Sequence, residues 1–393
     1  MTDPFTPSGT GLSVRSIYLD SNASTPVDPR VLDHMHHCWI NAFGNPGSQH
    51  SFGRTARQVL EDSRESIASI LDADPSEVIF TSGGTESLNM AIHGFTLGRR
   101  GVIAATMGEH PAVWEACRNA VMNGLSEAVI SVDSQGRLTA DGLDQLPWKD
   151  LRLACVILAH NETGVIQDLT ELSGRCLKSG VPLLLDGVQA VGKMPVSFRN
   201  LGATAVAFGA HKFHGPRGVG GLLLRRGVKV PALLAGGYQE SGRRAGTEAV
   251  PLIAGMARAL ELWQAESIER EKSVKGLRDR LQEELLERCA PAIVHGRAAV
   301  RLPNTLSIAF PGVPGEALLV NLHLAGIACS LGSTCASGSM EPAKSLLAMG
   351  VSPEVCKSSV RFSLSCHNTE AEIQEAIQRI TAIVGRMRTE KAG

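Results

Sequence analysis

Short apolar runs alternate with amphipathic stretches through most of the chain, which is typical of strands separated by helices. Helical periodicity is clear at residues 55–71 and 86–94, each beside an apolar run. Strands that read as continuously apolar are buried on both faces, so the pattern predicts βαβ units and a mainly parallel sheet covered by helices. The expected strands are residues 78–81, 101–105, 128–132, 153–158, 181–185, 204–208 and 220–224.

The pattern changes towards the C-terminus. Residues 220–224 follow 204–208 too closely for a crossover helix, so we expect that pair to be antiparallel. Residues 252–289 predict a long helix, highly charged after Gln264, that leads out of the first unit. Beyond it, expected strands alternate with helices and indicate a second α/β lobe. These strands are residues 305–310, 327–330 and 360–365, and the helices are 316–325 and 370–387.

This organisation predicts three parts. Residues 1–16 form a flexible tail, because they are polar and rich in Gly, Pro and Ser. Residues 17–260 form a large domain, whose first residues pack with the small domain. Residues 261–393 form that small C-terminal domain.

Composition narrows the classes of function. Hydrophobic residues make up 43% of the 393 residues and charged residues 20%, as in globular proteins. The net charge of −1 supplies no basic field, so we expect neither nucleic acid nor membrane as a partner. No apolar run reaches membrane-spanning length, and the N-terminal residues lack the charged start and apolar stretch of a signal peptide, so we expect a cytoplasmic protein. Nine cysteines without a CxxC pair suit neither a disulfide framework nor a zinc site.

Two polar residues stand at the ends of expected strands. Asp186 ends an apolar run, where a carboxylate is costly unless it is paired with a cation. Lys212 follows His211 at the end of another run, where poor hydration lowers the pKa of a lysine and favours imine chemistry. Taken alone, Asp186 is explained equally well as a helix cap, and Lys212 is better explained as a surface residue. Together they suit pyridoxal 5′-phosphate, which needs a lysine for its aldehyde and an acid for its pyridine nitrogen.

A phosphate site is available as well. The strand at 78–81 leads through Gly84 and Thr85 into a helix, so backbone N–H groups and the Thr85 hydroxyl would face a phosphate. A plain capped helix is the alternative at this point. A nucleotide-binding loop at 187–193 is disfavoured, because Met194 stands where that loop needs Ser or Thr. A dinucleotide loop at 215–221 is disfavoured because it enters a strand instead of a helix.

No metal site is expected from the sequence. The candidate group lies in a stretch after Pro29 that reads as an exposed helix, and exposed histidines on such a helix are common without a metal. Its members are His34, His36, His37 and Cys38.

An ordered set of motifs runs along nearly the whole chain, from Ile17 to Met387. It comprises Asp20, Gly44-Asn-Pro-Gly-Ser48, Thr81-Ser-Gly-Gly-Thr-Glu-Ser87, Glu109-His110, Asn161-Glu162, Asp186-x-x-Gln189, His211-Lys212, Gly246-Thr247 and Ser359-Val-Arg-Phe-Ser363. The chain thereby resembles the cysteine desulfurases of the NifS/IscS kind, within the class V aminotransferase family. The resemblance implies an α/β fold-type-I pyridoxal-phosphate transferase, with a mainly parallel seven-stranded sheet in the large domain and a smaller α/β C-terminal domain.

The resemblance also implies roles for individual residues. Lys212 would carry the cofactor as a Schiff base and shuttle protons, Asp186 would pair with the ring nitrogen, and His110 would stack on the ring and act as an acid or base. The remaining roles go to Asn161 and Gln189 at the ring, Gly84, Thr85 and His211 at the phosphate, Thr247 from the partner subunit of a homodimer, and Asn45 and Arg361 at the substrate.

The chain departs from the family at Gly209, where a serine usually contacts the phosphate. The missing hydroxyl would weaken cofactor binding modestly, or the Gly209 backbone N–H would serve in its place.

The reaction depends on Cys335, which lies in a Gly/Ser-rich segment. Small polar neighbours would leave its thiolate accessible, although composition alone equally allows a buried cysteine. By resemblance Cys335 is the nucleophile that takes sulfur from L-cysteine, releases L-alanine and passes its persulfide to an acceptor protein, such as an iron–sulfur scaffold or a sulfur carrier. The alternatives are a selenocysteine lyase, an aminotransferase without a cysteine nucleophile, and a catalytically impaired scaffold protein.

Overall fold

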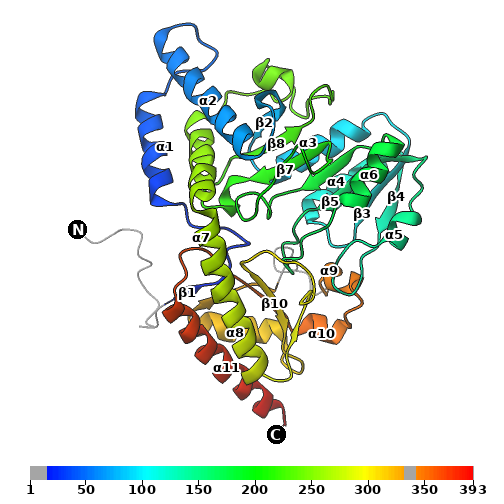
Figure 1. The fold of residues 1–393 in the computed structure, drawn as a ribbon, viewed down its shortest axis with the longest axis vertical. Coiled ribbons are helices and arrows are strands. Elements are labelled where there is room, and N and C mark those ends of the chain that lie inside the picture. The colour runs from blue at the N-terminus through cyan, green and yellow to red at the C-terminus, as the bar shows by residue number, and fades with distance from the viewer. Residues whose placement is uncertain (1–15, 332–341, 393) are drawn as a thin grey trace.

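The computed structural model describes residues 16–331 and 342–392 (Figure 1). The expected tail, apart from residue 16, lies outside these ranges, and so does Cys335.

A seven-stranded sheet forms the centre of the larger part of the molecule (Figure 1). Its order is β2 (Val78–Thr81), β8 (Gly220–Leu224), β7 (Ala205–Gly209), β6 (Leu183–Asp186), β5 (Leu151–Ile157), β3 (Gly101–Thr106) and β4 (Leu125–Ile130). The strands from β7 to β4 are parallel to one another, whereas β8 is antiparallel to both of its neighbours. The prediction of a mainly parallel sheet is confirmed, including the antiparallel pair.

Among the predicted strands, β4 was placed least accurately. β4 begins at Leu125 and ends at Ile130, whereas the apolar pattern placed it at 128–132. The cause is its position at the edge of the sheet, where Ser126 and Glu127 are exposed to water. An edge strand needs no continuous apolar run, so the start of β4 carries little hydrophobic signal.

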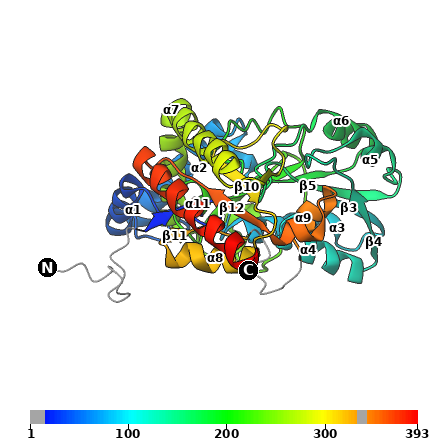
Figure 2. The same ribbon diagram turned by 90° about the horizontal axis from the view of Figure 1, so that it is seen from below.

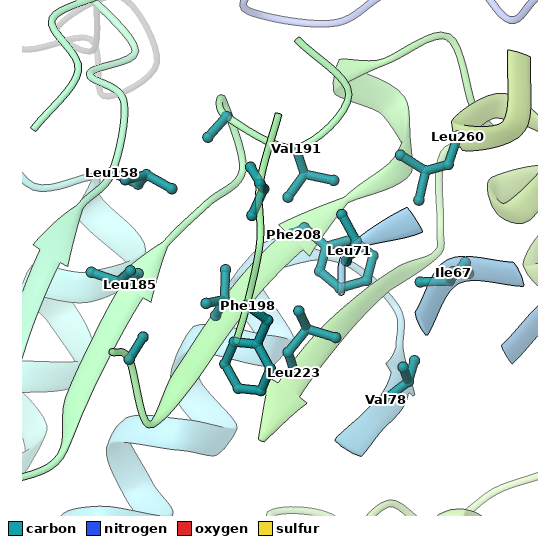
Figure 3. Packing of buried hydrophobic residues seen from close by; sticks show 14 of the residues in the cluster. Ile67, Leu71, Val78, Leu158, Leu185, Val191, Phe198, Phe208, Leu223 and Leu260 are labelled. Atoms are coloured by element: carbon teal, nitrogen blue, oxygen red, sulfur yellow. The ribbon is translucent and has the colours of Figure 1, made fainter. Parts of the chain in front are cut away.

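Alternation along the strands places two apolar layers on the sheet. In β7, Ala205 and Ala207 face one layer, whereas Val206 and Phe208 face the other. The first layer is covered by α3 (Gly84–Thr96) and α4 (Pro111–Met122). The second is covered by α2 (Ser51–Ile70), α6 (Thr170–Ser179) and the beginning of α7 (Val250–Arg288), and Figure 3 shows Phe208 and Phe198 within it.

The long helix α7 contributes to two hydrophobic cores. Its residues up to Leu262 belong to the core of the large sheet, whereas those from Val274 to Leu285 belong to a second core. Ile17 and Leu19, from the start of the described chain, also lie in that second core. The C-terminal helix α11 (Glu370–Ala392) runs alongside α7 there (Figures 1 and 2). The division of the chain at residue 260 stays a prediction.

The second core is built on smaller sheets. β12 (Ser359–Ser363), β10 (Thr305–Ala309) and β9 (Ile293–Val294) form an antiparallel sheet, and β1 (Ile17–Tyr18) pairs in parallel with β11 (Ile327–Ala328). The further helices are α1 (Pro29–Asn41), α5 (Ala140–Asp144), α8 (Gly315–Leu324), α9 (Lys344–Ala348), α10 (Pro353–Lys357) and α11 (Glu370–Ala392). Within the described ranges, no helix has both the length and the apolar character needed to cross a membrane.

Candidate active site

The site lies at one edge of the large sheet, where the carboxyl ends of its parallel strands meet. The segments that follow five of these strands carry Gly84 after β2, His110 after β3, Asn161 after β5, Asp186 at the end of β6 and Lys212 after β7. Ligands in α/β sheets bind at this edge. These five residues line one cavity of about 500 Å³, together with Thr85, Gln189, His211 and Arg361.

Lys212 sits in a short 3₁₀ turn directly after β7. Its Nζ donates to the backbone oxygens of Asn22 (2.8 Å) and Ala23 (2.9 Å). Burial lowers the pKa of Lys212 to about 8, and the nearby positive charge of Arg361 acts in the same direction. About one-tenth of this amine is therefore uncharged at pH 7, far more than for a solvated lysine, and the uncharged form is the one that attacks a carbonyl.

Asp186 and His110 are ionisable groups that line the same cavity as Lys212. The Asp186 carboxylate accepts from the Val188 N–H (3.0 Å), and burial raises its pKa. Such a carboxylate is stabilised by a positive partner in the cavity. His110 caps α4, and its Nδ1 accepts from the Ala112 N–H (3.1 Å), so the neutral ring carries its proton on Nε2. Burial lowers the pKa of His110.

The turn between β2 and α3 is shaped by close approaches that require glycine. A Cβ on Gly84 would lie 2.5 Å from Val188 Cγ2, and a Cβ on Gly220 would lie 2.6 Å from Gly83 Cα. The first backbone N–H groups of α3 have no side-chain cap, and Thr85 lines the cavity beside them. Such a helix start binds anions.

Arg361 reaches the cavity from β12 of the second core. Its Nη2 pairs with Asp20 Oδ1 (2.7 Å) and its Nη1 donates to the Asn161 oxygen (3.0 Å). Its Nε is buried and has no hydrogen-bond partner among the described residues. A buried N–H without a partner is costly, which favours a ligand oxygen at this position.

Three predicted site residues do not line the cavity. Asn45 is exposed in the loop before α2, and its Oδ1 accepts from the Gly47 N–H. Thr247 is exposed before α7. Gly209 lies against the turn between β2 and α3, where a Cβ added to Gly209 would be 3.3 Å from the Gly84 nitrogen. A serine there therefore requires a small shift of that turn.

A polar network behind Lys212 was not foreseen from the sequence. The buried Asn22 donates to the Asn161 oxygen (3.0 Å) and accepts from Lys193 Nζ (2.9 Å), and its backbone oxygen accepts from Gln189 Nε2 (2.9 Å). Lys193 also donates to Gln189 Oε1, so its Nζ faces these amides, and burial lowers the pKa of Lys193 well below its usual value. Lys193 is the lysine that a nucleotide-binding loop at 187–193 would use for phosphate, and its bonds to Asn22 and Gln189 further weaken that alternative. The only sequence signal for Asn22 is its place in the motif that begins at Asp20.

Glu109 is a second residue whose role the sequence did not specify. Its Oε1 accepts from Thr106 Oγ1 (2.7 Å) and from the Ile157 N–H (2.9 Å), which joins the ends of β3 and β5. Burial raises its pKa to about 8, so the side chain is largely a neutral acid at pH 7.

Comparison with known proteins places this geometry in a family. The family model for the class V aminotransferases matches residues 17–376. The chain belongs to the class V aminotransferase family. A relative from Nostoc sp. named cysteine desulfurase is 41% identical to this family member over 377 residues, covering 95% of the chain and 94% of the relative. One from Azotobacter vinelandii named cysteine desulfurase NifS is 39% identical over 379 residues, covering 95% and 93%.

Solved structures agree with this assignment. A NifS-like protein superposes on this class V chain with a TM-score of 0.88 at 35% identity, covering 94% of the chain and all of that protein. A NifS-like protein from Rickettsia africae gives 0.85 at 31% identity, covering 94% and 99%. The family and the fold predicted from the sequence are therefore confirmed.

Proposed function

We propose that this chain is a pyridoxal-phosphate-dependent cysteine desulfurase, which takes sulfur from L-cysteine, releases L-alanine and holds the sulfur as a persulfide on Cys335. The observation that carries the proposal is the meeting of the Lys212 amine, the Asp186 carboxylate and the Gly84–Thr85 helix start in one cavity. The names of relatives that match the chain over nearly its full length support the same reaction.

The residues present fit the cofactor. The cavity volume of about 500 Å³ is within the range usual for small-molecule sites. It offers an uncapped helix start for a phosphate and a buried carboxylate for a positively charged ring nitrogen. Its lysine has a pKa lowered to about 8 and so supplies an amine for an aldehyde. These three groups match the phosphate, the ring nitrogen and the aldehyde of pyridoxal phosphate.

Each residue has a part in the proposed reaction. The bound cofactor supplies an aldehyde for attachment and a ring that withdraws electrons from the substrate. Lys212 holds the cofactor and then moves protons at the substrate, because its amine is buried and readily deprotonated. Asp186 holds the ring nitrogen in its positive form. His110 lies over the same cavity with a proton on Nε2 and acts as an acid or base.

Arg361 and Cys335 act on the substrate itself. The Arg361 guanidinium, with its unpartnered Nε, takes the substrate carboxylate, whereas the described residues offer no contact that would let Asn45 assist it within the same chain. The Cys335 thiolate attacks the substrate sulfur, so an S–S bond forms while the Cβ–S bond breaks. The bonding electrons stay on the substrate carbon, which takes a proton and leaves as alanine. The Cys335 persulfide then passes its outer sulfur to an acceptor protein.

We infer a homodimer. Thr247 is exposed and lies outside the cavity of its own chain, so its side chain can contact the cofactor in the cavity of a partner subunit. Size measurement in solution, together with complementation between a Lys212→Ala subunit and a Thr247→Ala subunit, tests this inference. Mixed dimers should recover part of the activity, and no recovery would contradict the shared site.

The reaction is tested by replacing Cys335 with Ala in the cofactor-bound protein. We expect the visible absorbance of the bound cofactor to be unchanged and sulfide release from cysteine to fall to background. Undiminished sulfide release in this variant would contradict the persulfide step, and would favour a lyase that needs no cysteine nucleophile. Cys329→Ala is the matched control, because Cys329 is the nearest other cysteine in the sequence.

A further inference from the structure

Three potential metal ligands lie close together beside the turn that carries Lys212, on the side that faces the second core. They are His214, two residues after Lys212, and the adjacent pair Cys366 and His367 after β12. One ligand atom from each lies within 4.8 Å of the others. Neither Cys366 nor His367 belongs to the cavity that holds the proposed reaction.

His214 is held so that its free nitrogen points at the cysteine. Its backbone N–H donates to Thr25 Oγ1 (2.7 Å) and its oxygen accepts from the Asp28 N–H (3.0 Å), with the backbone at a φ of +66° that is unusual for a non-glycine residue. Its Nδ1 lies 3.0 Å from the Pro26 oxygen. A carbonyl oxygen only accepts, so Nδ1 carries the proton and Nε2 keeps its lone pair. This is the usual arrangement of a metal-binding histidine.

The distances suit a small tetrahedral ion. His214 Nε2 is 3.7 Å from Cys366 Sγ. A zinc ion with bonds of about 2.3 Å to sulfur and about 2.0 Å to nitrogen holds these atoms about 3.5 Å apart. The His367 ring lies edge-on to that of His214, with 4.8 Å between the ring centres. A modest rotation of the exposed His367 therefore completes three ligands.

The loop that carries the pair is fixed by its own hydrogen bonds. The Ser365 N–H donates to Asn368 Oδ1 (2.9 Å), and Asn368 Nδ2 donates to the Tyr18 oxygen (3.1 Å). His214 and Cys366 also line a cavity of about 50 Å³, which has room for a water as a fourth ligand. Cys366 is half-buried and His367 is exposed, so an ion has a path from solvent.

The charges around the cluster permit a divalent cation. Arg270, Lys193, Lys212 and Glu271 line the same small cavity. Arg270 is paired with Glu266 Oε2 (2.6 Å) and lies 3.8 Å from Asp28 Oδ2, so its charge is largely offset. The Nζ atoms of both lysines donate to oxygens of Asn22, and burial lowers the pKa of each lysine, which reduces their positive charge. Deprotonation of the Cys366 thiol on binding adds one further negative charge.

We propose that His214, Cys366 and His367 form a binding site for a borderline-soft divalent ion, of which Zn²⁺ is the representative, with water as the fourth ligand. Two imidazoles and one thiolate favour Zn²⁺ over Mg²⁺ or Ca²⁺, which take oxygen ligands. Binding releases the Cys366 thiol proton to water. The site ties the segment after Lys212 to the loop after β12. This differs from the expectation of no metal, because 152 residues separate His214 from Cys366 and no compact sequence motif marks them.

The test measures Zn²⁺ binding to the full-length, cofactor-bound protein by competition with a chromogenic chelator. The Cys335→Ala background removes the other candidate thiolate, and no turnover is needed, so the result is independent of the desulfurase proposal. We expect one equivalent of Zn²⁺, with affinity at least tenfold weaker after Cys366→Ser or His367→Ala. Co²⁺ in place of Zn²⁺ should give a thiolate charge-transfer absorbance that Cys366→Ser abolishes.

Matched controls separate the site from general metal binding. Cys329→Ser removes another half-buried thiol, and His323→Ala removes another exposed histidine, so both should leave Zn²⁺ affinity unchanged. Zn²⁺ binding with the same affinity in Cys366→Ser, or no stoichiometric binding at all, would overturn the proposal. In that case Cys366 and His214 form only an S–H···N hydrogen bond.

Discussion

The lowered pKa of the Lys212 amine leads to a prediction whose magnitude can be worked out from the structure. Burial lowers its pKa from 10.5 to about 8. At pH 7 an amine with a pKa of 8 is about one-tenth neutral, whereas one with a pKa of 10.5 is about one part in three thousand neutral. Lys212 in the protein without cofactor should therefore supply roughly 300 times more nucleophilic amine than a solvated lysine.

Competitive acetylation measures this quantity directly. The apoprotein is labelled with trace acetic anhydride across a pH series, N-acetyl-lysine amide serves as the internal standard, and the Lys212 peptide is quantified by mass spectrometry. Because only the neutral amine reacts, the labelling curve should reach its midpoint near pH 8, well below that of the standard. A midpoint that coincides with the standard would refute the argument from burial.

Two variants test the secondary cause of the lowered Lys212 pKa, which is the charge of its neighbours. Arg361 lowers the Lys212 pKa by charge repulsion, so Arg361→Met should move the midpoint upwards. Asp186 acts in the opposite direction, and Asp186→Asn should move it downwards. If both variants shift the midpoint the same way, a general structural change and not charge is responsible.

Three further predictions follow from contacts at the site. Gly84→Ala should lower the unfolding free energy by about 1–3 kcal/mol, because the new Cβ meets Val188 Cγ2, and adding Val188→Ala should restore most of the loss in urea unfolding. Asn22→Ala removes four hydrogen bonds of a buried side chain and should cost about 2–4 kcal/mol, whereas the exposed Asn123→Ala should cost less than about 0.5 kcal/mol. Arg361→Lys should raise the KM for cysteine about 10–100-fold with a smaller change in kcat, since it removes the unpartnered Nε–H donor, whose hydrogen bond to a carboxylate is worth about 1.5–3 kcal/mol. An unchanged KM would exclude Arg361 as the carboxylate ligand.

Much of the fold could be predicted because the central strands are buried on both faces. β2 and β8 occur at the predicted residues, since each is a short apolar run bounded by polar or glycine-rich turns. β4 could not be placed correctly, because it exposes Ser126, Glu127 and Val129 and so lacks a continuous apolar run, whereas β2, at the other edge of the sheet, is buried throughout. The length of α7 was predicted within two residues at its start, but its contribution to two cores is a tertiary feature.

The candidate site was predicted in part. Asp186, Lys212 and Gly84 follow strands of one parallel sheet, so topology brings them to one edge whatever their separation in sequence. Asn22 and Glu109 act through hydrogen bonds to backbone atoms of distant segments, and no sequence spacing encodes those partners. The pairing of Arg361 with Asp20 likewise joins the two ends of the chain. Such contacts depend on how the two hydrophobic cores are docked.

The central claim is that Lys212 holds the cofactor while Cys335 takes the sulfur. Its most direct test follows L-cysteine turnover with a reductant present, measuring alanine and sulfide together in the wild-type protein and in the Lys212→Ala and Cys335→Ala variants. The account predicts one alanine per sulfide for the wild type. Lys212→Ala should lose both products, and Cys335→Ala should release no sulfide while keeping the cofactor absorbance. Equal production of alanine and sulfide by Cys335→Ala and wild type would contradict the account.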